Sequence, residues 1–252
     1  MDIFDLHQGL PREAPGSDEA TLRALRLVPD LPAAPRILDI GCGPGAQTLV
    51  LARETNGTVT AVDIHQPYLD ELERRARASG LAREITTVRA SMLALPFEPA
   101  SFDLIWGEGS IYIAGFETGL RRWTQFVRPG GSIVVSELTW LTAHPPQAAR
   151  DFWNGEYPAM TTLAENRAIV ERCGLTLLSD FVLPRVAWFP EYYDPLSARI
   201  AALAERYRDD SAALQLLEWQ RAEIDIVRRH GDSFGYAFFL ARRRGTGEGA
   251  GA

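Results

Sequence analysis

Strand-like and helix-like patterns of apolar residues alternate along the chain. Short apolar runs bounded by turn residues predict strands, and they lie at 37–40, 58–63, 85–89, 102–106, 133–136, 175–182 and 234–240. The stretches between them predict helices, at 18–27, 46–54, 68–78, 115–127, 162–173, 195–207 and 211–230. Because the two kinds of element alternate, we expect an α/β fold with a doubly wound, mostly parallel sheet.

Turn residues set several of these boundaries. Ser17 is a candidate N-cap for the helix that follows it, and Gly174 is the expected residue just after the helix at 162–173. Pro129-Gly130-Gly131 is expected to form a turn that separates the helix at 115–127 from the fifth strand. Each of these positions predicts where an element ends.

Two segments are longer than the connections that a doubly wound sheet needs. One is 139–161, after the fifth strand, and the other is 188–230, where a short turn would join the last two strands. Ligands bind at the carboxyl ends of strands in such sheets, so both segments are expected to cap a site. We therefore expect an N-terminal lid segment and helix over 1–35, a main domain over 36–242 with these two caps, and a disordered tail over 243–252.

Composition and charge narrow the class of partner. The chain has 252 residues, of which 46% are hydrophobic, enough for one large core. Its formal net charge of −7 argues against nucleic acid and anionic membranes, because both select a concentrated basic face. No apolar run approaches the ~18–20 residues that span a bilayer, and the first residues lack the basic segment of a secretory signal. We expect a small-molecule partner and a cytoplasmic location, with the oligomeric state open.

Rare and missing residue types exclude several chemistries. All 26 basic residues are arginine, which excludes a Schiff-base lysine of the chain's own and a Gly-Lys-Ser/Thr phosphate loop. Cys42 and Cys173 are spaced neither for a disulfide framework nor for zinc, and the four histidines lack metal-ligand spacing. We therefore expect reduced thiols and no metal site.

The segment 36–48 is a candidate nucleotide-binding loop. An apolar strand opens there into glycines at 41, 43 and 45, which allow a sharp turn and leave no side chain between the backbone and a ligand. Asp63 ends the second strand, where an acid binds the two hydroxyls of a ribose. The loop by itself fits a nicotinamide dinucleotide as well as S-adenosylmethionine.

Motifs farther along the chain separate these cofactors. Leu-Asp-Ile-Gly-Cys-Gly-Pro-Gly (38–45), Val-Thr-Ala-Val-Asp (59–63), Leu-Pro-Phe-x-x-x-Ser-Phe-Asp-Leu-Ile (95–105) and Val-Arg-Pro-Gly-Gly-Ser-Ile (127–133) occur in this order. The succession resembles the class I S-adenosylmethionine-dependent methyltransferases. This resemblance implies a Rossmann-like, seven-stranded sheet whose last strand is antiparallel. Residues 10–17, 106–112 and 151–153 are similar to a subgroup of bacterial small-molecule methyltransferases.

The resemblance also implies which residues hold the cofactor. Its ribose would lie on Asp63, with Ile64 against the adenine. For Asp39 an alternative stays open, in which the carboxylate fixes the loop without touching the cofactor. Ser91 stands where the family usually has an acid that accepts from the adenine amino group. The full set expected to bind the cofactor is Asp39, Gly41, Cys42, Gly43, Gly45, Asp63, Ile64, Ser91, Met92, Trp106 and Gly107.

Candidate catalytic and acceptor-binding residues lie outside the glycine loop. Glu108 follows the fourth strand, where the family's chain passes beside the transferred methyl group, so it is expected to orient the substrate or accept its proton; a salt-bridged loop acid is the alternative. His7 and His144 are candidate bases. Aromatic residues of the two caps either pack the caps or wall a pocket that, with Glu108, suits a cationic acceptor. The residues expected to bind substrate are Arg12, Tyr112, Trp153, Tyr157, Trp188 and Tyr192.

The leading hypothesis is methyl transfer from S-adenosylmethionine to a small molecule. The acceptor atom is open, because the same cofactor fold serves several nucleophiles and function depends on the residues around the site. Two alternatives remain. The bare glycine pattern also fits an NAD(P)-dependent oxidoreductase, and a non-catalytic protein that binds S-adenosylmethionine would carry the same motifs.

Overall fold

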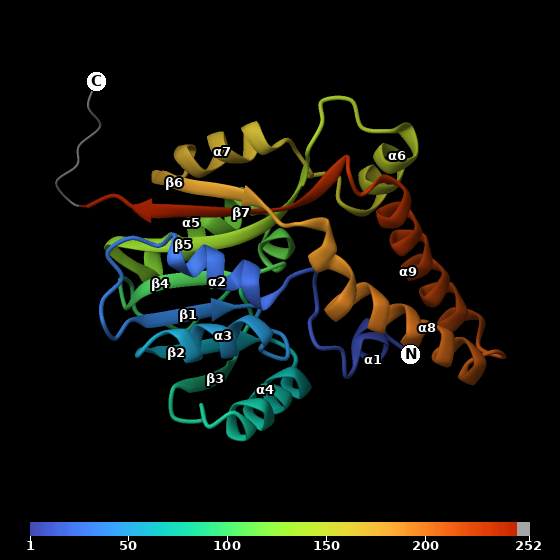
Figure 1. The fold of residues 1–252 in the computed structure, drawn as a ribbon, viewed down its shortest axis with the longest axis horizontal. Coiled ribbons are helices and arrows are strands. Elements are labelled where there is room, and N and C mark those ends of the chain that lie inside the picture. The colour runs from blue at the N-terminus through green and yellow to red at the C-terminus, as the bar shows by residue number, and fades with distance from the viewer. Residues whose placement is uncertain (246–252) are drawn as a thin grey trace.

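The computed structural model describes residues 1–245 and contains one seven-stranded sheet with the order β3-β2-β1-β4-β5-β7-β6 (Figure 1). The strands are β1 (Arg36–Ile40), β2 (Thr58–Asp63), β3 (Ile85–Arg89), β4 (Phe102–Gly107), β5 (Val127–Trp140), β6 (Leu175–Val182) and β7 (Phe234–Arg243). Only β7 runs antiparallel to its neighbours in this sheet, β5 and β6. The predicted doubly wound, Rossmann-like fold with an antiparallel last strand is confirmed.

Helices cover both faces of the sheet and its carboxyl edge. They are α1 (Ile3–His7), α2 (Asp18–Arg26), α3 (Ala46–Glu54), α4 (Gln66–Ala78), α5 (Phe116–Trp123), α6 (Gln147–Glu156), α7 (Leu163–Arg172), α8 (Asp194–Arg206) and α9 (Ser211–His230). A 3₁₀ turn (Ile111–Ala114) precedes α5, and a π-helical turn (Phe189–Tyr193) precedes α8. Ser17 caps α2 by accepting from the Ala20 N–H at 3.2 Å, and Gly174 has a positive φ of 78° after α7.

Alternate residues of each central strand face opposite layers of the core, as the period of a β-strand requires. Ile37 of β1 and Trp106 of β4 belong to a buried cluster that includes residues of α2, α3, α8 and α9. Their neighbours in sequence, Leu38 and Ile105, belong to a second cluster with residues of α5 and α7. The sheet is therefore buried on both faces, so a ligand would approach it at the ends of its strands.

The Pro129-Gly130-Gly131 segment was expected to be a turn, and this prediction is wrong. The segment lies inside β5, where a shift of register separates the Phe102–Val127 pair from the Leu104–Ser132 pair. A Cβ on Gly131 would lie 2.7 Å from the Asp103 carbonyl oxygen, so only glycine allows this approach of the two strands. The segment is a bulge that keeps β5 paired with β4.

Both predicted caps lie beyond the carboxyl end of the sheet. Strands β5 and β6 are each antiparallel to β7, so they run in the same direction. Figure 1 shows α6, α8 and α9 gathered beyond the end to which the arrows of β1 and β6 point, with α1 beside them. These elements surround the edge where open α/β sheets bind ligands.

The N-terminal segment crosses this edge and is held by two arginines. Arg199 of α8 donates to the carbonyl oxygens of Leu6 and Asp5 at 2.6 and 2.5 Å. Arg75 of α4 donates to those of Pro11 and Leu10 at 2.9 and 3.2 Å. Residues 1–17 are thus tied to α8 on one side and α4 on the other.

The C-terminal strand is longer than predicted and continues to Arg243. The Arg243 guanidinium donates to the carbonyl oxygens of Thr124, Gln125 and Val127, which fixes the end of the strand. The expected tail falls mainly on residues 246–252, which lie outside the described residues. Within residues 1–245, no helix combines the length and apolarity needed to cross a membrane.

Candidate functional site

The glycine loop turns sharply at the end of β1 and exposes its backbone. Gly41 and Cys42 donate their N–H groups to the Val62 carbonyl oxygen at 2.8 and 3.0 Å, which ties the loop to β2. Gly41 has a φ of +72°, and a Cβ there would lie 2.5 Å from the Ser110 Cβ. The loop therefore tolerates only glycine at this position, and its backbone forms part of a cleft.

This cleft, called the glycine cleft below, has a volume of about 490 Å³. Among the residues expected to bind a cofactor, it is lined by Gly41, Gly43, Asp63, Ile64, Ser91 and Met92. Ile64 is 58% exposed, which leaves an apolar surface available to a ligand. Ser91 accepts from the Leu93 N–H at 3.2 Å, so its hydroxyl proton stays free for an acceptor in the cleft.

Asp63 is held in place by two backbone hydrogen bonds. One carboxylate oxygen accepts from the Gly43 N–H at 3.0 Å and the other from the His65 N–H at 2.9 Å. Each oxygen of an ionised carboxylate accepts more than one hydrogen bond. The side chain is therefore oriented by the loop and keeps acceptor capacity for two neighbouring hydroxyl groups.

Asp39 lies below the loop and not in the glycine cleft. It is completely buried and accepts from Thr48 Oγ1 at 2.6 Å and from Gln47 Nε2 at 3.4 Å. Burial raises the pKa of Asp39 to about 7, and the Thr48 and Gln47 hydrogen bonds oppose that shift. The geometry favours the alternative in which Asp39 fixes the loop to the first turn of α3.

Four other expected cofactor residues are also placed outside the glycine cleft. A Cβ on Gly45 would lie 2.2 Å from Leu72 Cδ1, so Gly45 allows α3 to pack on α4. Trp106 is fully buried, and Gly107 packs against the ring of Trp123. Cys42 is buried in a recess of about 40 Å³ beside the loop, and burial raises the pKa of its thiol well above the usual value. These four residues support the packing around the loop and do not line the glycine cleft.

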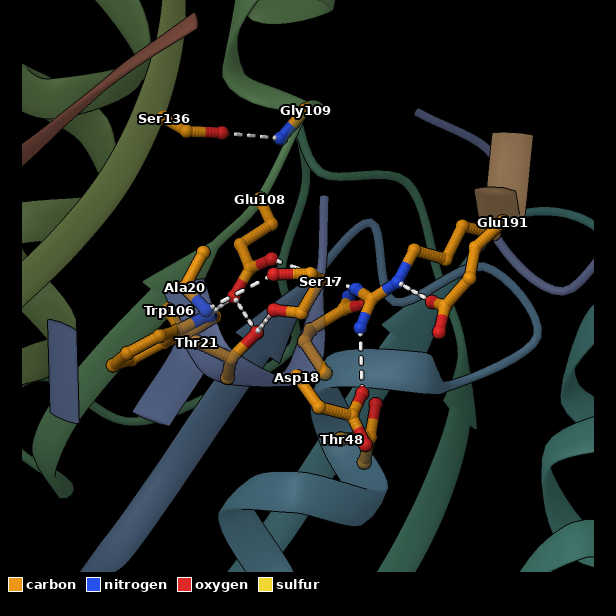
Figure 2. A network of polar contacts seen from close by, with 12 residues as sticks. Ser17, Asp18, Ala20, Thr21, Thr48, Trp106, Glu108, Gly109, Ser136 and Glu191 are labelled. Atoms are coloured by element: carbon orange, nitrogen blue, oxygen red, sulfur yellow. Dashed lines mark hydrogen bonds and ion pairs between the residues drawn. The ribbon is translucent and has the colours of Figure 1, made fainter. Parts of the chain in front are cut away.

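Glu108 belongs to a buried polar network that holds the N-terminal segment (Figure 2). Its Oε1 accepts from Thr21 Oγ1 at 2.7 Å and from Trp106 Nε1 at 2.8 Å. Burial raises the pKa of Glu108, and the nearby Arg12 guanidinium, whose Nη1 lies 3.7 Å from Oε2, opposes that shift. Glu108 contacts Thr21 of α2 and lies beside Arg12, so the geometry favours the alternative of a salt-bridged loop acid.

Arg12 is the cationic centre of the same network. Its side chain is 4% exposed and pairs with Asp18 at 2.7 Å and with Glu191 at 2.5 Å. The π-helical turn before α8 is thereby joined to the N-terminal segment. Arg12 lines the recess beside the loop but neither the glycine cleft nor the cavity that adjoins it, so its position does not support the expectation that it binds substrate.

A second cavity, called the aromatic cavity below, adjoins the glycine cleft. It has a volume of about 190 Å³ and is lined by five aromatic residues that the sequence predicts for substrate binding: Tyr112, Trp153, Tyr157, Trp188 and Tyr192. Ile3, His7, Glu13, Gly109 and Tyr112 line both spaces. The two spaces therefore share a boundary. A ligand group in the glycine cleft would face a ligand group in the aromatic cavity across it.

His7 lies at this boundary with a free ring nitrogen. Its Nδ1 is 2.9 Å from Glu13 Oε2, which also accepts from the Tyr68 hydroxyl at 2.7 Å. A carboxylate only accepts, so Nδ1 carries a proton, and in the neutral imidazole Nε2 has a free lone pair. Within the described chain Nε2 is buried without a hydrogen-bond partner, and the ring meets Tyr192 edge-on. The arrangement suits a general base.

His144 is placed differently. It is exposed in the loop between β5 and α6, where its backbone N–H donates to Thr142 Oγ1 at 3.3 Å. It lines neither the glycine cleft nor the aromatic cavity. The prediction that His144 is a catalytic base is not supported by this position, whereas His7 lines both spaces.

Comparison with known proteins assigns the domain. Residues 37–131 match the family described as methyltransferase domain. The chain is 27% identical over 95% of its length to 27-O-demethylrifamycin SV methyltransferase of Amycolatopsis mediterranei (strain S699), covering 90% of that protein. The chain carries a class I S-adenosylmethionine-dependent methyltransferase domain.

Two further relatives agree with this methyltransferase assignment, and one solved structure has the same fold. The chain is 31% identical to methyltransferase GfsG of Streptomyces halstedii over 43% of its own length and 40% of that protein. It is 32% identical to dimethylglycine N-methyltransferase of Parasynechococcus marenigrum (strain WH8102) over 53% of its length and 50% of that protein. The methyltransferase from Thiobacillus denitrificans in complex with S-adenosyl-L-homocysteine has the same fold, with a TM-score of 0.81, 20% identity, and coverage of 97% of this chain and 100% of that one.

Several residues around the glycine cleft and the aromatic cavity carried no motif. Glu13 contacts His7 and also accepts from Tyr68, which lies 55 residues away in the sequence. Glu223 lines the aromatic cavity, where it accepts from the Tyr193 hydroxyl at 2.7 Å and from Gln220 Nε2 at 3.0 Å. One signal was available: Gln220 interrupts the buried stripe of α9, and a polar residue on an apolar helix face requires a partner. Within residues 1–245, no group of three His, Cys, Asp or Glu side chains forms a candidate metal site.

Proposed function

We propose that this methyltransferase moves the methyl group of S-adenosylmethionine from the glycine cleft to a small molecule in the aromatic cavity. The observation that carries the proposal is the boundary shared by the two spaces, with His7 in it. Methyl transfer needs the nucleophile and the methyl group in line and water kept out. A cleft and a cavity that meet at one buried base provide this arrangement.

The residues of the glycine cleft fit the proposed cofactor. Asp63 would accept from the two ribose hydroxyls, since its carboxylate is already oriented by the loop. Gly41 and Gly43 would bring backbone close to the methionine part, and a Cβ on either would meet Ser110 or Glu13. Ile64 and Met92 would contact the adenine, with Ser91 beside its edge.

The bound cofactor supplies an electrophilic methyl group on a sulfonium sulfur, and the chain supplies position and a base. His7 Nε2 would take the proton from the acceptor, while Glu13 and Tyr68 keep the ring in one orientation. Trp153, Trp188 and Tyr192, each less than 10% exposed, would exclude water. Glu108 and Arg12 would act at a distance by holding residues 1–17 across the site.

The size of the aromatic cavity favours a small acceptor. Its volume of about 190 Å³ is below the ~300–1,000 Å³ typical of sites for drug-sized ligands. Two of the three named relatives act on acceptors of very different size, a rifamycin in one and dimethylglycine in the other, and the volume of the cavity suits an acceptor of the smaller size. The net charge of −7 supports a metabolite over nucleic acid, in the cytoplasm, where two reduced thiols are stable.

Titration calorimetry tests the cofactor first. S-adenosylmethionine and S-adenosyl-L-homocysteine should bind to the full chain with a stoichiometry of one, and NAD should not. Binding of NAD alone would support the oxidoreductase. A panel of small amines, alcohols, phenols and thiols should then release S-adenosyl-L-homocysteine; binding without release for every member would support the non-catalytic protein.

A further inference from the structure

We infer that the aromatic cavity takes its acceptor as a small cation, an amine that carries a hydroxyl or carbonyl oxygen. The inference rests on the proposed function, since it names the class of acceptor for the same site. Four features of the cavity wall support it: its charge, one carboxylate, its aromatic faces and two free N–H donors.

The charged groups in the wall are acidic. Glu13, Glu156 and Glu223 line the cavity, and His7 is the single basic side chain among the lining residues that the structure describes. The chain has no lysine, since all 26 basic residues are arginine, and no arginine of residues 1–245 lines this cavity. The nearby Arg12 is committed to Asp18 and Glu191. A carboxylate or phosphate ligand would meet like charge here.

Within residues 1–245, the groups that donate hydrogen bonds to Glu223 are neutral. The Tyr193 hydroxyl and the Gln220 amide donate to its two oxygens, at 2.7 and 3.0 Å. Desolvation raises the pKa of Glu223, and the Tyr193 and Gln220 hydrogen bonds and the nearby His7 oppose that shift. An ammonium group in the cavity would favour the ionised carboxylate further.

Aromatic side chains line the same cavity as this carboxylate. Tyr192, Tyr193 and Trp188 are each at most 6% exposed, and Trp219 is 38% exposed on the same helix as Glu223. Aromatic faces attract cations, and quaternary ammonium groups are recognised in this way. A neutral phenol would gain the apolar contact but not the charge interaction.

Two indole N–H groups indicate a second feature of the ligand. Within the described residues, Trp153 Nε1 and Trp188 Nε1 are buried without hydrogen-bond partners. Their residues line the cavity. Because indole N–H only donates, a ligand oxygen that accepts would satisfy these groups, whereas a plain alkylamine would leave both unpaired.

The reaction of such an amine balances. The ammonium group gives one proton to His7 Nε2. The nitrogen lone pair forms the new N–C bond, the C–S bond breaks with its electron pair going to sulfur, and the cofactor leaves as a neutral thioether. The product is a protonated methylamine, and the proton on His7 returns to solvent.

The test measures cation binding separately from cofactor binding. With S-adenosyl-L-homocysteine bound to the full chain, tetramethylammonium and its neutral analogue tert-butyl alcohol are titrated by calorimetry. Tetramethylammonium should bind at least about 10-fold more tightly. Glu223→Gln, which keeps an acceptor for Tyr193, should weaken tetramethylammonium by about 10- to 100-fold and leave S-adenosyl-L-homocysteine unchanged.

Controls make the test independent of folding and of the proposed function. Glu205→Gln removes an acid of α8 whose side chain is 81% exposed, and should change nothing. If Glu223→Gln does not fold, Trp219→Leu at an exposed position should weaken tetramethylammonium by about 5-fold. Failure of S-adenosyl-L-homocysteine to bind would contradict the proposed function instead.

Turnover supplies a second arm. 2-Aminoethanol should release more S-adenosyl-L-homocysteine than ethylamine, phenol or acetate does. Preferential turnover of phenol or acetate, equal binding of tetramethylammonium and tert-butyl alcohol, or absence of binding by both would overturn the inference. If no member of the panel is methylated, the binding comparison decides.

Discussion

The glycine cleft and the aromatic cavity meet at one boundary but are built in opposite ways. The cleft presents the glycine-loop backbone and one oriented carboxylate at the ends of adjacent strands β1 and β2, with apolar side chains such as Ile64 and Met92 beside them. The cavity is made of side chains from the N-terminal segment, α6, α9, β7 and the turn before α8. The difference shows how a shared cofactor chemistry can stay constant while the acceptor site varies.

The largest expected effect is at the boundary itself. His7→Ala removes the proposed base, so turnover should fall by about 10²- to 10⁴-fold, while calorimetry should show cofactor affinity nearly unchanged. His144→Ala is the matched control, since that histidine is exposed and lines neither space. Loss of turnover in His144→Ala with retention in His7→Ala would reverse the two assignments.

A buried acid behind the aromatic cavity should make this side of the protein sensitive to pH. Burial raises the pKa of Glu137 from 4.5 to about 8, although Tyr157 and the Leu138 amide oppose it. The folded state then favours the protonated form of Glu137. The contribution of this side chain to the free energy of unfolding is therefore complete at low pH and is lost as pH rises from about 4.5 to about 8. The full loss is on the order of 5 kcal/mol, at about 1.4 kcal/mol for each of the roughly 3.5 units between the two pKa values.

Glu137→Gln should remove most of that loss. Melting temperatures of the wild type should fall between pH 5 and pH 8.5, and those of the variant should fall much less. Glu218→Gln, at a side chain that is 76% exposed, is the control and should follow the wild type. Parallel pH curves for Glu137→Gln and the wild type would rule out this source of the pH dependence.

A smaller effect is expected on the cofactor side. Asp63→Ala should weaken S-adenosyl-L-homocysteine by about 1–3 kcal/mol, the scale of a lost charge-assisted hydrogen bond, measured by calorimetry. Tetramethylammonium affinity should stay unchanged, because Asp63 does not line the aromatic cavity. Asp209→Ala, at a side chain that is 93% exposed, serves as control. Unchanged cofactor affinity would remove Asp63 from the site.

The smallest effect is expected for Glu108→Gln. The amide keeps an acceptor for Thr21 and Trp106 but loses the charge beside Arg12, so stability should fall by about 1 kcal/mol and turnover by less than 10-fold. Denaturant unfolding and steady-state kinetics measure the two. A loss of turnover as large as that of His7→Ala would restore Glu108 as a catalytic residue.

The elements that local periodicity decides were easier to predict than the pairing and side-chain directions that other elements decide. The strands at 58–63 and 85–89 and the helices at 46–54 and 211–230 have the predicted bounds, because local periodicity decides them. Pro129-Gly130-Gly131 was misassigned because turn residues also form bulges, and only the pairing with β4 distinguishes the two. Glu108 is a related case. Its position after β4 was clear from the sequence, but the direction of its side chain depends on the hydrogen bond from Thr21 of α2.

The sequence by itself determined the sheet, the glycine loop, the place of Asp63 and the class of cofactor. The sheet and the loop depend on backbone conformations and spacings within a few residues, which amino-acid types such as glycine report directly, and the class of cofactor followed from the resemblance of the ordered motifs to a known family. Only the tertiary structure decided that Glu13 bonds both His7 and Tyr68, that Glu108 and Arg12 hold the N-terminal segment, and that Glu223 lines the aromatic cavity. Those contacts join residues far apart in the chain, and their geometry exists only once the caps have packed on the sheet.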